Sequence, residues 1–198
     1  MATLTTERHA IRKASIPSTG DPFGPEFATA WLESLVEAGL VAGPVLVASE
    51  EMLAEAVALA LRGVDVKLAA SGAAADRCRD EAKRAGARLK AVFPGGVFGV
   101  KPWQMGSVAT IFDRTVFAGL EPDQRFAYVS RMGRILAPEG RLIGVFRLGG
   151  DGGDAPRALP RERFEQLFFR YFTLEQFVLA APAAPGADEA WCGVLRRK

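Results

Sequence analysis

Apolar and polar positions along this chain alternate between the spacing of a strand and the spacing of a helix. From residue 44 onward, short apolar runs are each followed by a stretch that has one charged and one apolar face, a pattern typical of successive β–α units. The predicted strands are 44–48, 64–70, 88–93, 107–112, 141–148, 171–180 and 189–197. The predicted helices are 25–40, 51–62, 73–86, 122–136 and 160–169.

Strands that alternate with helices predict a mostly parallel sheet with helices on both faces. The last two predicted strands are separated only by the Pro-, Ala- and Gly-rich segment 182–188. That segment is too short for a helical crossover, so these strands are expected to form an antiparallel hairpin at the sheet edge. The sequence therefore predicts an α/β fold that is Rossmann-like and seven-stranded, with strand 44–48 in the middle of the sheet.

The chain divides into an N-terminal arm and one domain. Residues 1–24 are polar and contain several Pro and Gly residues, and they are interpreted as an arm. Residues 1–20 are expected to be mobile in isolation, because they have too few apolar groups to offset the cost of ordering. Residues 25–198 show no linker or internal repeat and are predicted to be one domain. His9 is the only histidine and no Cys pair lies near it, so it is interpreted as a surface residue and no metal site is predicted.

Composition narrows the class of protein. The 198 residues include no run of about 20 apolar residues and no N-terminal apolar segment, so neither a membrane helix nor a signal peptide is predicted. Cys78 and Cys192 are too few for a disulfide framework and favour two free thiols in a reducing cytoplasm. The net charge of +2 comes from scattered basic residues, which gives no reason to expect a nucleic-acid partner.

Three segments carry a resemblance to a known family. Residues 111–146 place Asp-Arg directly after a predicted strand, then a helix, then the sequence LAPEGRL leading into the next strand. Residues 152–168 place a Gly- and Pro-containing loop before a helix, and AWCGVLRRK (190–198) closes the chain. Together they resemble the thiopurine methyltransferase family over roughly residues 44–198. The resemblance implies the seven-stranded methyltransferase fold and S-adenosylmethionine (SAM) as the family's cofactor.

The residues that should hold SAM are absent. In the family, the loop after the first strand carries three glycines, which let the backbone approach the cofactor closely. The flanking residues fix the register, and those glycine positions are here Ser49, Glu51 and Leu53. Ala70 stands where the family has an acid that accepts hydrogen bonds from the ribose hydroxyls, and Val97 replaces an acid on the adenine side. We expect Leu53 to project into the cofactor space and Glu51 to place a negative charge there.

These losses all fall on contacts to one ligand, so no cofactor is predicted. The favoured interpretation is a methyltransferase-like protein that has lost SAM binding and works as a non-catalytic binding or scaffold protein. Its partner would be another protein, such as an enzyme of the same pathway, or a second copy of the chain. One alternative is an active SAM-dependent methyltransferase of small molecules with an unusual cofactor loop. Another is a small-ligand-binding protein that uses the old pocket.

Aromatic and sulfur side chains gather in the Gly-rich loop 94–106. Phe98, Trp103 and Met105 could line a pocket or partner surface, or cap the end of the sheet, and the sequence does not separate these possibilities. The family's N-terminal Pro-Trp is matched only by Pro22-Phe23, so Phe23 is a further candidate for this surface.

The pair Asp113-Arg114 follows the fourth predicted strand. Ligands bind at the carboxyl ends of such strands, so the pair could be functional. The favoured interpretation is structural, with the pair forming an ion pair that holds the loop to a helix. Cys192, within a predicted strand, is interpreted as a buried apolar residue, because no histidine is available to activate it.

Overall fold

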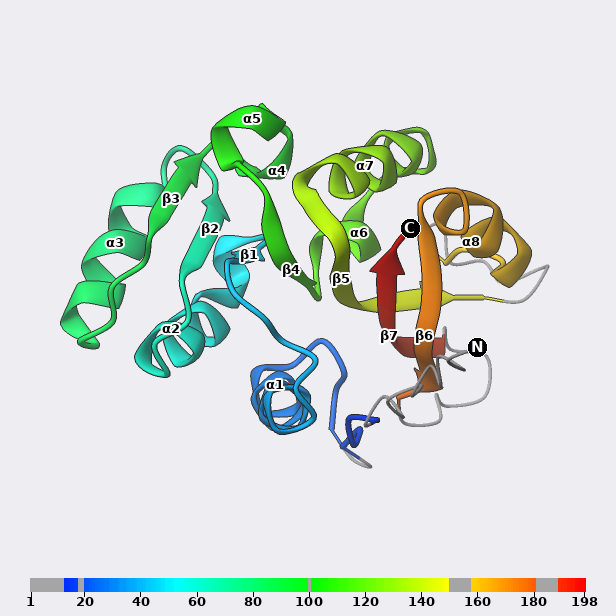
Figure 1. The fold of residues 1–198 in the computed structure, drawn as a ribbon, viewed down its shortest axis with the longest axis horizontal. Helices are drawn as coiled ribbons and strands as arrows, with labels where there is room; N and C mark the ends of the chain where they lie inside the picture. Colours follow the sequence, from blue (N-terminus) through cyan, green and yellow to red (C-terminus); the bar gives the residue numbers. More distant parts are fainter. Residues whose placement is uncertain (1–12, 18–19, 100, 150–157, 181–188) are drawn as a thin grey trace, which may run out of the picture.

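The computed structural model describes residues 13–17, 20–99, 101–149, 158–180 and 189–198. Its centre is a seven-stranded sheet in the order β3-β2-β1-β4-β5-β7-β6 (Figure 1). Neighbouring strands from β3 to β5 pair in parallel, and β7 pairs antiparallel with both β5 and β6. The strands are β1 (Val45–Val47), β2 (Val66–Ala70), β3 (Ala91–Pro94), β4 (Val108–Asp113), β5 (Leu136–Leu148), β6 (Phe172–Leu179) and β7 (Glu189–Arg197). The predicted fold class and terminal hairpin are confirmed.

Helices cover both faces of this sheet. In the view of Figure 1, α1 and α2 lie below the strands, and α5 and α7 lie above them. The helices are α1 (Pro25–Glu37), η1 (Glu50–Met52), α2 (Leu53–Leu61), α3 (Ala75–Arg84), α4 (Gly96–Gly99), α5 (Pro102–Met105), α6 (Val116–Gly119), α7 (Pro122–Ile135) and α8 (Arg161–Phe168). Because strands β1 to β5 are parallel, their carboxyl ends lie at the same edge of the sheet, together with the loops that lead to the following helices.

Two segments differ from the predicted boundaries. β5 begins at Leu136, five residues before the predicted start, because the chain leaves α7 directly in extended conformation. The pairing with β4 then shifts register, and Glu139 takes a positive φ of 64° inside the strand. Segment 94–106, predicted as a loop, contains the short helices α4 and α5.

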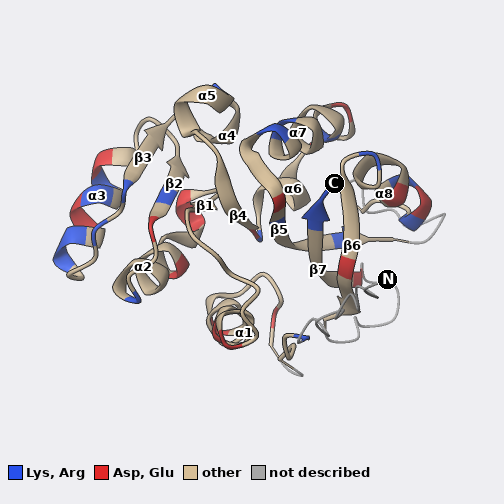
Figure 2. Ribbon diagram, in the orientation of Figure 1, with Lys and Arg blue, Asp and Glu red and all other residues tan. Residues whose placement is uncertain are grey.

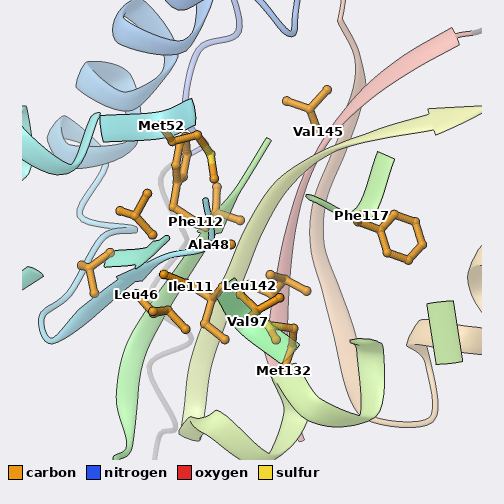
Figure 3. Packing of buried hydrophobic residues seen from close by; sticks show 14 of the residues in the cluster. Leu46, Ala48, Met52, Val97, Ile111, Phe112, Phe117, Met132, Leu142 and Val145 are labelled. Atoms are coloured by element: carbon orange, nitrogen blue, oxygen red, sulfur yellow. The ribbon is translucent and has the colours of Figure 1, made fainter. Parts of the chain in front are cut away.

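The core lies on both sides of the central strands. Figure 3 shows Leu46, Ile111 and Leu142 of the neighbouring strands β1, β4 and β5 packed between Met52 and Met132. Beyond β5, a second group of rings packs edge to face or in stacks, with centroids 4.3–5.6 Å apart. Its members are Phe117, Phe146, Phe164 and Phe168.

Cys78 on α3 and Cys192 on β7 are both buried and unpaired, as predicted. Within the described ranges, no helix is long and apolar enough to cross a membrane. Most of the predicted arm, including His9, lies outside the described residues. Where the arm is described, the backbone of Ala14 donates to and accepts from the side-chain amide of Gln176 on β6, at 3.2 and 2.8 Å. At this residue the arm is attached to the edge strand of the sheet.

Candidate functional site

A hollow of about 370 Å³ opens near the carboxyl ends of β1, β2 and β3. Open parallel sheets bind their ligands at this edge. Its walls combine small polar groups, glycine backbone and apolar side chains. The lining residues are Ala48, Ser49, Glu50, Ser71, Gly72, Gly95, Gly96, Val97, Phe98, Val116 and Leu120. Among them, Glu50 is the only residue with an ionisable side chain.

Ser49 starts the helix that follows β1. Its backbone is extended, and its Oγ accepts a hydrogen bond from the Glu51 N–H at 3.2 Å. Such a cap satisfies one of the free N–H groups at a helix start. The chain then forms the 3₁₀ turn η1 before it enters α2. An N–H group that a glycine loop would leave free for a ligand is therefore already bonded within the protein.

Glu50 reaches from the end of β1 to the end of β2. Its Oε2 accepts a hydrogen bond from the Ser71 N–H at 3.1 Å, and Ser71 directly follows β2. Burial acts to raise the pKa of Glu50, but hydrogen bonds from the Ser71 side chain and from the Glu50 and Ser71 backbone outweigh it and leave the pKa below its ordinary value. The side chain is therefore a carboxylate at neutral pH, and it links the two loops between which a SAM ribose would lie.

These residues do not fit SAM as the family holds it. Ala70 is fully buried and has no side-chain acceptor to offer ribose hydroxyls. The carboxylate found between the two strand ends belongs to Glu50, and it is already bonded to Ser71. Val97 is also buried, in contact with the core, so it offers the adenine side no polar group. In Figure 3 it lies beside Leu142 and Met132.

The structure corrects the expectation for two of the glycine positions. Glu51 is exposed, and Leu53 is partly buried against the core, so neither lines the hollow. The prediction that Leu53 blocks the cofactor space is therefore wrong, because the helix turns this side chain toward the core. The negative charge is present, but Glu50 supplies it in place of Glu51. The sequence comparison missed Glu50 because that residue lies between the glycine positions.

Asp113 and Arg114 do not pair with each other, which corrects the predicted ion pair. Arg114 instead contacts Glu55 on α2, with its Nε and Nη2 at 3.2 and 3.0 Å from Oε1, and both side chains are buried. Arg114 also donates from Nη1 to the backbone oxygen of Phe23. The Phe23 ring in turn lies under the Arg147 guanidinium, 4.3 Å from ring centroid to Cζ. The structural interpretation of Arg114 holds, with a different partner.

Asp113 is buried at the end of β4 and organises the chain that follows. Its carboxylate accepts hydrogen bonds from the N–H groups of Thr115, Val116 and Phe117, at 2.8–3.1 Å. It also accepts one from the hydroxyl of Tyr128 on α7. Burial and the adjacent Asp113 carboxylate raise the pKa of Tyr128 well above its ordinary value. Asp113 therefore holds α6 and α7 in place and is not presented to a ligand.

The aromatic loop divides into buried and exposed side chains. Met105 is buried and so caps the sheet; it does not form part of a surface. Phe98 lines the hollow and lies 6.3 Å from Tyr128 between ring centroids. Trp103 is 73% exposed. Phe98 therefore belongs to the lining of a pocket, Met105 to the core and Trp103 to the exposed surface.

Comparison with known proteins assigns the family. The model of a family described as thiopurine S-methyltransferase matches residues 47–185, which includes the hollow and most of the sheet. The chain belongs to this family. No curated protein matches the sequence. The matched range includes Ser49, Glu51 and Leu53, the positions at which this family member lacks the glycines of the cofactor loop.

Solved structures similar to this family member show the same fold. One, reported for the conversion of a disulfide bond into a thioacetal group during echinomycin biosynthesis, is 19% identical with a TM-score of 0.67 and covers 90% of this chain and 88% of that one. The N-methyltransferase NodS from Bradyrhizobium japonicum WM9 is 16% identical, with a TM-score of 0.64 and coverage of 89% and 97%. The magnesium protoporphyrin IX methyltransferase from Synechocystis PCC 6803 with bound SAH is 12% identical, with a TM-score of 0.65 and coverage of 86% and 82%.

Proposed function

We propose that this family member has lost SAM binding and acts as a non-catalytic binding protein, with a protein partner in the reducing cytoplasm. The observation that carries the proposal is the Glu50 carboxylate, which crosses from the β1 loop to Ser71 and uses the donors at the end of β2. The unpaired state of both cysteines agrees with a reducing compartment.

The loss of affinity can be estimated from the contacts. A missing hydrogen bond from a ribose hydroxyl to a carboxylate at position 70 costs about 1.5–3 kcal/mol. Loss of close backbone approach at the capped Ser49 turn costs on the order of the same amount again. The sum corresponds to about two to four powers of ten in the dissociation constant. A micromolar cofactor site would therefore weaken to about 0.1–10 mM, a range centred near millimolar affinity.

The hollow itself favours a second candidate, a small-ligand-binding protein. At about 370 Å³ it is within the usual size range of ligand pockets, and Val97, Phe98 and Leu120 give it apolar walls. Such a ligand would bind next to the Glu50 carboxylate, which is the only ionised side chain in the lining of the hollow.

The test compares SAM and SAH binding by equilibrium dialysis to the wild type, to Glu50→Gln and to the control Glu51→Gln. Each substitution removes one negative charge, and the two residues are neighbours in the chain, but only Glu50 lines the hollow. We expect no binding tighter than about millimolar by the wild type or the control. We expect Glu50→Gln to bind SAH more tightly than the control because the charge is removed, but no tighter than about millimolar, since position 70 still lacks an acceptor and Ser49 still caps the turn. Micromolar binding by the wild type, or methyl transfer to any acceptor, would refute the proposal and support the alternative of an active methyltransferase.

A further inference from the structure

A second hollow, of about 320 Å³, lies on the molecular surface between α5 and α7, away from the lining of the first. Its walls come from the first residue of α5 and from one face of α7. The lining residues are Pro102, Phe126, Ala127, Ser130, Arg131 and Arg134. We refer to this feature as the α5/α7 groove.

Large aromatic side chains are exposed at the groove. Phe126 in its wall is 50% exposed, and Trp103, the residue after Pro102, is 73% exposed. The Lys101 ammonium lies 4.8 Å from the Trp103 ring centroid. Exposed apolar surface costs free energy in water, and clusters of it mark interaction sites. Trp and Arg are also the residues that contribute most often to binding hot spots.

The groove is positively charged. Its lining contains two arginines and no acid, and the Nε–H of Arg131 is buried without a hydrogen-bond partner among the described residues. A buried unpaired donor is costly. Because this atom is shielded from solvent, an acceptor from outside reaches it only when the side chain shifts. The acid Asp123 lies eight residues before Arg131, about 12 Å along the helix axis. Figure 2 shows acidic colouring of α7 only at the start of the helix, with basic segments after it.

We propose that the α5/α7 groove binds an acidic segment of a protein partner, with a carboxylate on Arg131 and Arg134 and an apolar side chain against Phe126. The inference rests on the proposed function, because it supplies the partner surface of a non-catalytic protein. A second copy of the chain is a poorer occupant. A twofold axis through the groove would bring the same arginines of both copies together, and like charges at an interface are unfavourable.

A display library of random peptides, selected on the full-length protein, tests the chemistry of the occupant. We expect enriched peptides to contain Asp or Glu next to an aliphatic or aromatic residue. Their affinities are then measured as synthetic peptides by fluorescence anisotropy. Arg131→Ala and Phe126→Ala should each weaken binding by about tenfold or more, as expected for hot-spot residues. The control Leu61→Ala removes a side chain that is 58% exposed on α2 and should leave binding unchanged.

Several results would overturn the inference. These are no enrichment, enrichment of neutral or basic peptides, or equal binding by the groove variants and the control. Dimerisation of the wild type in analytical ultracentrifugation that disappears in Phe126→Ala would assign the groove to a second copy and would also overturn it. SAM binding is measured on the same preparation, so that tight SAM binding refutes the proposed function while peptide selectivity still reports on the groove alone.

Discussion

Glu55→Gln should destabilise the protein far more than the double replacement Glu55→Met/Arg114→Met. The Glu55 and Arg114 side chains are 2% and 5% exposed, and two hydrogen bonds of 3.0 and 3.2 Å join them. Removing one partner leaves a buried charge without compensation, which typically costs about 3–5 kcal/mol. The neutral amide can still accept a hydrogen bond, so we expect the lower half of that range.

The double variant removes both charges and so avoids this cost. Glu55 Oε2 is buried and has no hydrogen-bond partner among the described residues, so the native pair does not recover all of its desolvation cost. Arg114 also donates to the backbone oxygen of Phe23, and loss of that bond costs about 1 kcal/mol. The double variant should therefore fall within about 1–2 kcal/mol of the wild type.

Urea unfolding followed by circular dichroism separates the two cases. With a slope of about 3 kcal/mol per molar urea, the single variant should lower the midpoint by about 1–1.3 M and the double variant by about 0.3–0.7 M. If Glu55→Gln lost less than about 1 kcal/mol, or if the double variant were the less stable of the two, the pair would not be the buried, coupled interaction inferred here.

Three further predictions follow from other contacts. The pKa of Glu50 is lower in the folded than in the unfolded protein. Its hydrogen bond to Ser71 should therefore stabilise the protein fully at pH values above the pKa of the unfolded state. This stabilisation should be lost as the pH falls through the pKa of the folded state. The stability difference between wild type and Glu50→Gln, from thermal melts, should then be constant near neutral pH and shrink toward acid pH, and an unchanged difference at acid pH would contradict the inferred contact. Gly144→Ala should lower the free energy of unfolding in urea by about 1–3 kcal/mol, because the added Cβ would lie 2.7 Å from the Asp113 backbone oxygen. The control Gly119→Ala should lower it less, because no atom lies within 4 Å of the added Cβ. Equal losses in the two variants would argue against close packing at β5. Burial raises the pKa of Cys192 to about 12, so iodoacetamide should label it at pH 8 only after denaturation, and rapid native labelling would show that the strand is accessible.

The fold could be predicted because its signals are local and repeated. An apolar run such as Val45–Val47, followed by a helical pattern, recurs along the chain. The segment between the last two strands is too short for a helical crossover, so those strands form a hairpin. The early start of β5 at Leu136 was missed, because Pro138 and Gly140 read as a turn. Helices α4 and α5 were missed because four residues are too few to show a helical period.

The site could be predicted only in outline. The register argument placed the changed positions in the loop after β1 and at the end of β2, where Ser49 caps η1 and Ala70 is buried. It could not show that η1 begins there, and this turn decides which of two adjacent acids points at Ser71. Likewise, Arg114 pairs with Glu55, 59 positions earlier in the chain, and no local pattern shows such a contact.

Direct titration with the cofactor tests the central claim, that the hollow no longer holds SAM. Isothermal titration calorimetry of the full-length wild-type protein with SAM, and separately with SAH, measures this without assuming an acceptor substrate. The account predicts dissociation constants of about millimolar or weaker for both ligands, and no cofactor released when purified protein is denatured. A micromolar dissociation constant for either ligand would contradict it and would show that Glu50 yields to the cofactor.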